Sequence, residues 1–263
     1  MEYYEINKRS WNATKELFKE GLFGDWIFRG QSNYKWKLRT TLEDLLLKDG
    51  LDPEVELDIY KTFQAKAHNY MEQQELPIDY FDWYALMQHY GAPTRLLDLT
   101  YSPYIACYFA LEMAIESYKY ACVYAINTNK LFEKIKSPMD IRLTYPDENI
   151  TAKNVVMGSY VINTITENRI KTVIPVTPRR FNQRLNNQQG LFIIPGNMRY
   201  SFEENLENVF PVPEKKSIIR ILIPVKLKNE ILDDLHLMNI TPETLFPGID
   251  GLAKSMRNLR NWI

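Results

Sequence analysis

The sequence predicts an α+β fold in which a helical N-terminal half packs on a mixed, mostly antiparallel C-terminal sheet. Apolar residues recur with helical spacing in the first half, whereas short β-branched and aliphatic runs dominate the second half. No linker rich in Gly, Ser or Pro separates the halves. We therefore expect a single domain over residues 1–263 that is helix-rich over 1–120 and strand-rich over 121–263.

Capping signals and apolar spacing define the helices of the first half. Ser10 can cap a helix that ends near Gly21, and Pro53 can occupy the first position of a longer helix. On this longer helix an apolar residue recurs at every fourth position, which predicts one buried stripe. The stripe consists of Val55, Ile59, Phe63, Ala67 and Met71.

The middle of the chain carries a forced turn and then a very apolar helix. Gly91 is the expected left-handed residue after a helix that ends at His89 or the next residue, and Pro93 prevents continuation. Ser102 then caps a helix over residues 104–116 that is apolar on nearly all sides. We expect this helix to be the central buried helix of the domain.

Strands are predicted by runs of β-branched, aliphatic and aromatic residues. One short run, Trp26–Phe28, lies in the first half. The runs of the second half are Ala121–Ile126, Thr172–Val176, Leu191–Ile194 and Ile218–Val225. The last of these is apolar on both faces apart from Arg220, as expected for a central strand. Polar stretches at about residues 137–154 and 197–216 predict long surface loops.

Bulk properties disfavour several classes of protein. A net charge of -1 argues against wholesale binding of nucleic acid or of an anionic membrane. No secretory signal is evident, and the longest apolar run falls short of the ~20 residues that span a membrane, so we expect a cytoplasmic protein without a membrane partner. Cys107 and Cys122 lie in apolar segments and are expected to be buried free thiols. With 3 His and 2 Cys, no metal site is expected.

Arg29 is the first candidate for a binding site. It directly follows the strand at residues 26–28. Its planar guanidinium can donate two parallel hydrogen bonds to a phosphate or a carboxylate. Gly30 lets the backbone turn or approach a ligand closely. The alternative is a structural ion pair between Arg29 and a loop carboxylate.

The polar segment 88–98 is the second candidate. His89 lies at a helix C-terminus, which favours a cation; protonated it would donate to an anionic ligand, and neutral it could act as a base. Alternatively, it hydrogen-bonds the last carbonyls of its own helix. Arg95 either pairs with Asp98 to lock the loop, or faces a pocket in which Asp98 orients it.

The amides before Gly190 are the third candidate. If the strand has already begun at Gln188 and Gln189, their side chains point to opposite faces, so only one can share a site with Arg29. A glutamine there could recognise a base, an amide or a ribose hydroxyl. The alternative is a solvated strand edge with a glycine bulge.

Several motifs of well-known enzyme classes are missing from the sequence. It lacks G-x-G-x-x-G, G-x-x-x-x-G-K-[ST], G-x-S-x-G and H-E-x-x-H. Classical dinucleotide folds, P-loop enzymes, α/β-hydrolases and zincins are therefore disfavoured.

At these candidate residues the chain resembles the FRG domain family, which is named for its Phe-Arg-Gly motif. The three-residue motif alone would not be specific, but the central block is, and the resemblance spans nearly the whole chain. Leu99 and Gly248 depart mildly from the family pattern, which often has Trp and an acidic residue there. The matching segments are Phe28–Gln31, Trp36–Arg39, Gln88–Asp98, Ser102–Pro103, Arg184, Gln188, Gly190, Phe192, Leu245–Gly248 and Gly251–Ala253.

The resemblance implies a bacterial or phage-associated protein, and the position of some members near defence genes implies a role in anti-phage defence. A weaker resemblance is to ADP-ribosyltransferase-like folds, in which an early Arg or His holds NAD and a late Glu positions the ribose. Arg29 would be the early residue here, and Gln188 stands at the late position. An amide cannot act as a carboxylate base.

Three hypotheses follow. The first is an ADP-ribosyltransferase-like enzyme that uses NAD or another nucleotide, with an unknown macromolecular target. The second is a non-catalytic module that senses a nucleotide or a phage component, and the third is a buried polar scaffold without a ligand. For the enzyme, the expected catalytic residues are His89, Gln188 and Arg29, and the expected ligand-binding residues are Arg29, Gly30, Gln31, Tyr90, Thr94 and Arg95.

Overall fold

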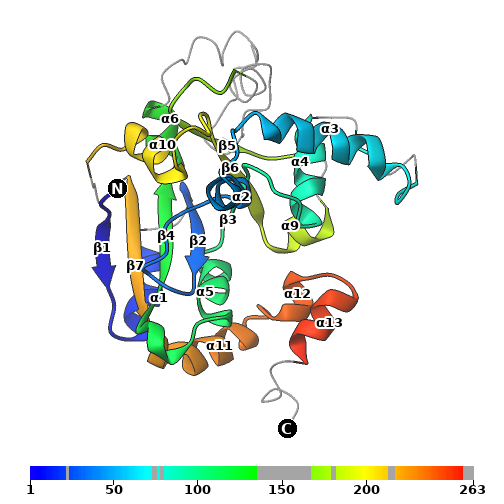
Figure 1. Ribbon diagram of the computed structural model, residues 1–263. Coiled ribbons are helices and arrows are strands. Elements are labelled where there is room, and N and C mark those ends of the chain that lie inside the picture. The colour runs from blue at the N-terminus through cyan, green and yellow to red at the C-terminus, as the bar shows by residue number, and fades with distance from the viewer. Residues whose placement is uncertain are drawn as a thin grey trace, which may run out of the picture.

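A computed structural model gives the fold of the chain (Figure 1). It describes residues 1–21, 24–72, 76–77, 80–134, 167–178, 182–212 and 217–256. Within these ranges the chain forms eleven α-helices and one seven-stranded sheet, so the α+β class is confirmed. Strands and helices alternate along the chain, however, so the predicted division into a helical half and a strand-rich half is wrong.

Three strands lie within the first 100 residues: β1 (Tyr4–Asn7), β2 (Trp26–Gln31) and β3 (Leu97–Thr100). The sequence predicted only β2. The other two are four residues long, too short for a clear alternating pattern. Their partners come from the far end of the chain, β7 for β1 and β6 for β3, so only tertiary pairing defines them.

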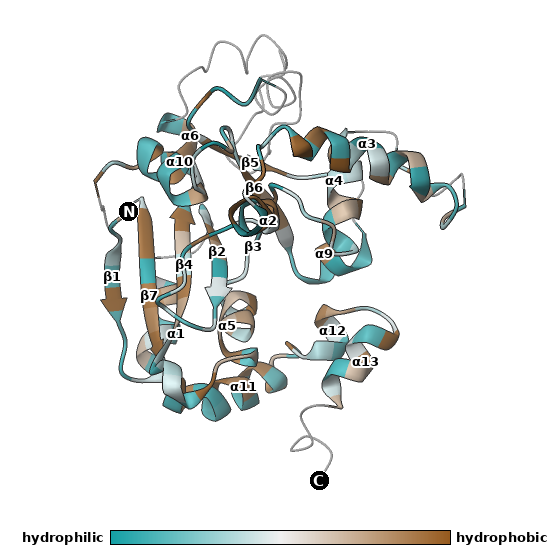
Figure 2. Cartoon of the chain, viewed as in Figure 1, coloured by the Kyte–Doolittle hydropathy of each residue, from teal (hydrophilic) through white to brown (hydrophobic). Residues whose placement is uncertain are grey.

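The other four strands were all predicted, with small shifts at their ends. The sheet order is β1-β7-β4-β2-β3-β6-β5, and only the β1–β7 pair is parallel, which confirms a mixed, mostly antiparallel sheet. Apolar residues are prominent along β4 and β7 (Figure 2). The bounds are Tyr120–Asn127 for β4, Val173–Val176 for β5, Gly190–Pro195 for β6 and Ile218–Pro224 for β7.

The sheet consists of two blocks of strands that meet between β2 and β3. In the larger block, β2 pairs with β4 along its whole length, from Trp26–Asn127 to Gln31–Cys122. The smaller block contains β3, β6 and β5. A single register pair, Phe28–Thr100, joins the two. Strand β2 therefore leaves part of its β3-facing edge without a neighbouring strand.

One face of the larger block is covered by α1 (Trp11–Gly21), α5 (Pro103–Glu112) and α11 (Lys228–Leu237) (Figure 1). As predicted, α5 is buried on nearly all sides, and the Ser102 hydroxyl caps its N-terminus by accepting a hydrogen bond from the Ile105 amide. It ends at Glu112 rather than at residue 116.

The opposite face carries a second core, to which α6 (Thr128–Lys134) and α10 (Phe202–Val209) contribute; α2 (Thr41–Asp49) lies nearby and packs against Met198. Part of the stretch expected as a loop at 197–216 is therefore helical. A capping box between Ser201 and Glu204 starts α10, whose apolar side packs into the core. The other expected loop, at 137–154, lies outside the described residues.

The smaller block is covered by α3 (Val55–Ala67) and α4 (Tyr80–His89), and α4 ends before Gly91 with φ 79°, as predicted. The expected stripe on α3 is not fully buried, because the helix lies at the edge of the fold and buries Glu56 and Tyr60 instead. The remaining helices are α9 (Gln183–Asn187), α12 (Pro242–Leu245) and α13 (Ile249–Ser255). No helix in the described ranges has the length and apolar character needed to cross a membrane.

Candidate functional site

Strand β2 distributes its side chains between the two faces of the sheet. Phe28 packs in the core beside α5, and Gly30 lies directly under that helix, where a Cβ would be 2.0 Å from a backbone oxygen. Alternation sends Arg29 and Gln31 to the opposite face, with Ile27, which belongs to the second core. The close approach that Gly30 allows is therefore made by α5.

Arg29 lies where the two blocks of the sheet meet. Its Nη1 donates a 2.7 Å hydrogen bond to the backbone carbonyl of Asp98 on β3, so the contact is not an ion pair. Its Nε is enclosed and has no hydrogen-bond partner among the described residues. Burial lowers the pKa of Arg29, and the nearby Asp98 carboxylate opposes this shift. The guanidinium thus bridges β2 and β3, and its Nε–H donor makes no hydrogen bond within the described residues.

A row of polar side chains continues from Arg29 across the larger block. The strand register places Arg29 beside Tyr124 and Tyr124 beside Arg220. Arg220 in turn lies beside Glu5, with which it forms an ion pair, and over the ring of Tyr3 at 5.2 Å. Its Nε, like that of Arg29, is buried without a partner in the described part of the chain. The sequence signal for this row was the lone arginine within an apolar strand.

Residues 34–37 form a strap that crosses this row. Backbone carbonyls of the strap accept hydrogen bonds from Arg220 at 3.1 Å, from the Tyr124 hydroxyl at 3.3 Å and from Gln31 Nε2 at 3.2 Å. Gln31 is only 9% exposed, and its Oε1 has no partner within the described ranges. Arg29 and Gln31 therefore present a buried unused donor and a buried unused acceptor on one face of β2.

Hydrogen bonding and burial shift the pKa values of ionisable side chains in and near this row. Burial lowers the pKa of Arg220, but its hydrogen bonds to Glu5 and Tyr124 outweigh that effect, and the net pKa is raised. Burial raises the pKa of the Cys122 thiol to about 12 and that of Cys107 further still. Both cysteines are buried and free, as expected, and both are protonated at neutral pH.

His89 ends α4, which packs on the face of β6 opposite to the second core. Its Nδ1 is enclosed without a partner among the described residues, and its ring meets that of Tyr90 edge-on with centroids 4.9 Å apart. Burial and the Arg184 guanidinium lower the pKa of His89, while Asp250 opposes them, so the neutral imidazole is favoured of the two forms that the sequence left open. No hydrogen bond or ring contact joins His89 to Arg29 in the described ranges.

Gln188 directly follows α9 and precedes β6, which begins at Gly190. Its Nε2 donates to the Leu245 carbonyl at 3.1 Å, and its backbone carbonyl accepts from Thr100 Oγ1 at 2.7 Å. The amide is therefore bound to α12 rather than to the row that contains Arg29. Gln189, with φ 46°, helps to line a polar cavity of 620 Å³ beside α12.

Thr94 and Arg95 are fully buried and serve the packing of α3 and α4. Arg95 Nε lies 2.7 and 2.9 Å from the two carboxylate oxygens of Glu56, and the pair lines a cavity of 500 Å³. The expected pairing of Arg95 with Asp98 is wrong, because α3 brings Glu56 to the guanidinium. Asp98 instead accepts a 2.8 Å hydrogen bond from Gln88, whose amide oxygen accepts from Thr94.

Residues 24–119 match the family model of the FRG domain. The chain contains an FRG domain. The matched segment includes Arg29, Gly30 and Gln31 together with the polar segment 88–98, but it stops before β4, β5, β6 and β7. Comparisons with curated proteins and with solved structures gave no match.

The FRG domain also contains Tyr90, which is 66% exposed and lines a separate cavity between α3 and α4. Among the described residues, no group of three or more His, Cys, Asp or Glu side chains is arranged to hold a metal ion. The candidate residues of the FRG domain therefore divide between a polar site around Arg29, a packing contact at Gly30 and an aromatic cavity at Tyr90.

Proposed function

We propose that this FRG domain protein binds a nucleotide-type small molecule, whose anionic group is held at Arg29. The observation that carries the proposal is the enclosed Nε of Arg29, which donates no hydrogen bond within the described residues. Arginine keeps its positive charge in proteins, and a buried cation is costly unless it is paired. A single carbonyl of Asp98 satisfies it only in part. A phosphate group would supply the missing charge and acceptors.

The second unused group beside Arg29 favours a nucleotide over a simple phosphate ion. The Oε1 of Gln31 is a buried acceptor that a sugar hydroxyl or a base amino group would satisfy. NAD carries a diphosphate, two riboses and an adenine amino group, so it offers both complementary features. NAD is therefore the first candidate ligand, with ADP-ribose and common nucleotides as the next.

Thermal unfolding with each nucleotide tests the proposal. We expect NAD or a related nucleotide to raise the Tm of the native protein, because a ligand that binds only the folded state stabilises it. Arg29→Met should weaken binding roughly ten- to hundredfold, since hydrogen bonds to charged groups contribute about 1.5–3 kcal/mol each. The matched control is Arg199→Met, because Arg199 is paired with Asp52 on the surface.

Either of two results would refute this proposal. One is a native protein whose Tm no nucleotide changes. The other is an Arg29→Met variant that folds and still binds as tightly as the native chain. Loss of folding in Arg29→Met, measured by circular dichroism, would instead support a buried scaffold.

ADP-ribosyl transfer is a second candidate function, and one observation favours it. Phe28 pairs with Thr100, and Thr100 donates to the carbonyl of Gln188, so β3 alone separates Arg29 from Gln188. Two strand spacings amount to ~10 Å, which a dinucleotide can span. In this role the enzyme would cleave the bond between nicotinamide and ribose of NAD and pass ADP-ribose to a macromolecular target, as part of anti-phage defence.

Nicotinamide release from NAD distinguishes transfer from sensing. A transferase should release nicotinamide, and Gln188→Ala should reduce turnover more than it reduces NAD binding. A protein that binds NAD and leaves it intact would be a sensing module for a nucleotide or a phage component. Purified protein that neither binds nor consumes NAD would exclude both NAD-based roles.

A further inference from the structure

A cavity of 770 Å³ lies between α3 and the C-terminal end of α4. Its walls include the apolar stripe that the sequence predicted on α3, which the fold leaves half-covered. The volume falls within the range of ~300–1,000 Å³ that is typical of small-molecule sites. The apolar lining consists of Ile59, Phe63, Ala67, Tyr70, Met71 and Tyr90.

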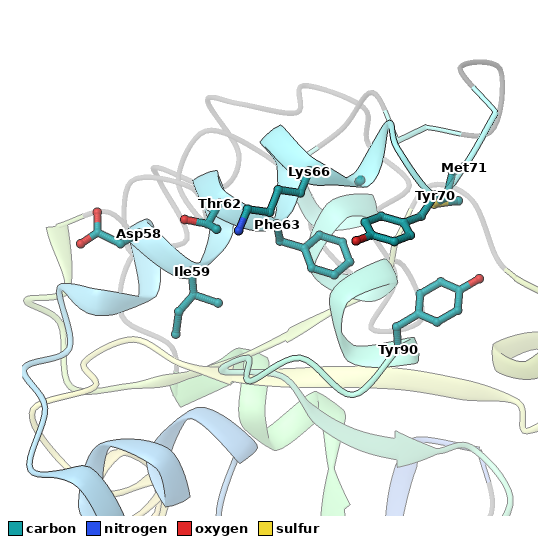
Figure 3. A pocket seen from close by; sticks show the side chains of 9 residues that line it. Asp58, Ile59, Thr62, Phe63, Lys66, Tyr70, Met71 and Tyr90 are labelled. Atoms are coloured by element: carbon teal, nitrogen blue, oxygen red, sulfur yellow. The ribbon is translucent and has the colours of Figure 1, made fainter.

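Aromatic rings gather at one end of this cavity. Figure 3 shows the rings of Phe63, Tyr70 and Tyr90 close together, with Tyr70 and Tyr90 on different segments of the chain. Tyr70 is 85% exposed and Tyr90 is 66% exposed, and neither hydroxyl makes a hydrogen bond within the described ranges. Two exposed tyrosines beside a phenylalanine form a surface on which a flat ring can stack.

A cation lies at the rim on the same helix. Lys66 lines the cavity, and its ammonium has no hydrogen bond or ion pair among the described residues. Asp58 also lines it, but two helical turns away, about 12 Å along α3. Figure 3 shows the Asp58 carboxylate at the opposite end, pointing away from the rings. In Figure 3 the Lys66 side chain extends towards Thr62, so its ammonium lies on the side of Phe63 that faces away from Tyr70 and Tyr90.

We propose that this cavity binds an aromatic small molecule that carries one anionic group. Its flat ring stacks on Tyr90 and Tyr70, its apolar body covers Phe63 and the α3 stripe, and its anion pairs with Lys66. The site is distinct from the one at Arg29, which is not part of the lining. It accounts for an apolar stripe that the protein's own packing covers only in part.

The fluorescent probe 8-anilinonaphthalene-1-sulfonate tests this proposal, because it joins an apolar aromatic body to one sulfonate. We expect saturable binding of one probe per native chain. Tyr90→Ser should weaken binding about tenfold, as expected for the loss of a stacking partner. Lys66→Gln should weaken it about two- to fivefold and reduce its dependence on salt, as expected for an exposed charge pair.

Matched controls come from the same chain. Lys61→Gln removes a lysine of α3 that does not line the cavity, and Tyr4→Ser removes an exposed tyrosine of β1. Both variants, and Arg29→Met, should bind the probe like the native protein. Because all the substituted lysines and tyrosines are on the surface, each lysine or tyrosine variant should keep the native Tm.

The proposal is overturned if the probe binds without saturation or if Tyr90→Ser and Lys66→Gln leave its affinity unchanged. Equal weakening by Lys61→Gln and Lys66→Gln would also overturn it, because probe affinity would then depend on the overall charge of the protein and not on a specific pair with Lys66. Probe affinity that falls only in Arg29→Met would assign the aromatic anion to the other site.

Discussion

Glu56 and Arg95 show how a residue that looks like a ligand contact can be structural. The guanidinium is 2% exposed, and Glu56 occupies its Nε and Nη2. Arg29 is the contrasting case, because its Nε has no partner in the described part of the chain. The two arginines carry the same charge, but only one has a carboxylate of its own. Partner geometry, rather than residue type, distinguishes a scaffold arginine from a candidate site.

Removing Arg95 should destabilise the protein strongly. Arg95→Met leaves the Glu56 carboxylate buried without its partner, which costs ~3–5 kcal/mol of unfolding free energy. The double variant Glu56→Leu/Arg95→Met should recover much of this loss, because no charge is then left buried. Urea unfolding followed by circular dichroism measures both effects. The exposed Arg199→Met is the control and should cost less than ~1 kcal/mol; an equal cost in both single variants would contradict this account.

At the level of elements, β2 and α5 define the position of Arg29. Gly30 allows the α5 backbone to pack directly on the strand, and this contact fixes which face of the sheet Arg29 occupies. The glycine of the Phe-Arg-Gly motif therefore has a packing role beside the arginine. The cavity at Tyr90 has a different origin, because α3 covers α4 only in part.

Gly30→Ala should separate α5 from β2. The new Cβ would lie 2.0 Å from the Ala106 oxygen and 2.5 Å from the Ala110 nitrogen, so backbone atoms must move. We expect a loss of ~1–3 kcal/mol or more, as for overpacked cores. Gly21→Ala is the matched control, since nothing lies within 4 Å of a Cβ there. Urea unfolding of both variants measures the difference, and similar midpoints would argue against the close contact.

For the whole molecule, the decisive feature is the joint between two blocks of strands. Strand β4 is hydrogen-bonded along its length to β2 and β7, whereas β2 and β3 share one register pair. Arg29 lies at this joint and bonds to β3 through Asp98. A ligand held at Arg29 would therefore contact the place where the sheet is least continuous.

Native-state hydrogen exchange should show that the joint between β2 and β3 opens more easily than the rest of the larger block. Amides of β4 should exchange only through global unfolding, while amides of β3 that face β2 should exchange through a local opening of lower free energy. A nucleotide that binds at Arg29 should slow exchange in β3. Strand β6, paired on both sides within the smaller block, is the internal control. Equal protection of β3 and β4 would contradict a weak joint.

Local sequence signals determined much of the fold. The cap at Ser102 predicted α5, and the glycine after α4 predicted where that helix ends. The β-branched runs predicted the strands β4 to β7. Each of these signals acts over only a few residues, so it can be recognised without the tertiary structure. The polar block and the Phe-Arg-Gly motif also identified the FRG domain.

Only the tertiary structure decided which of these residues meet. The strands β1 and β3, the Glu56–Arg95 pair and the row from Arg29 to Glu5 depend on partners far away in the chain, such as Arg220 and Glu5, 215 residues apart. The alternation of β2 separated Arg29 from α4 and His89, which local spacing could not predict. Strand register and helix packing arise from the whole core at once, so no local pattern encodes them.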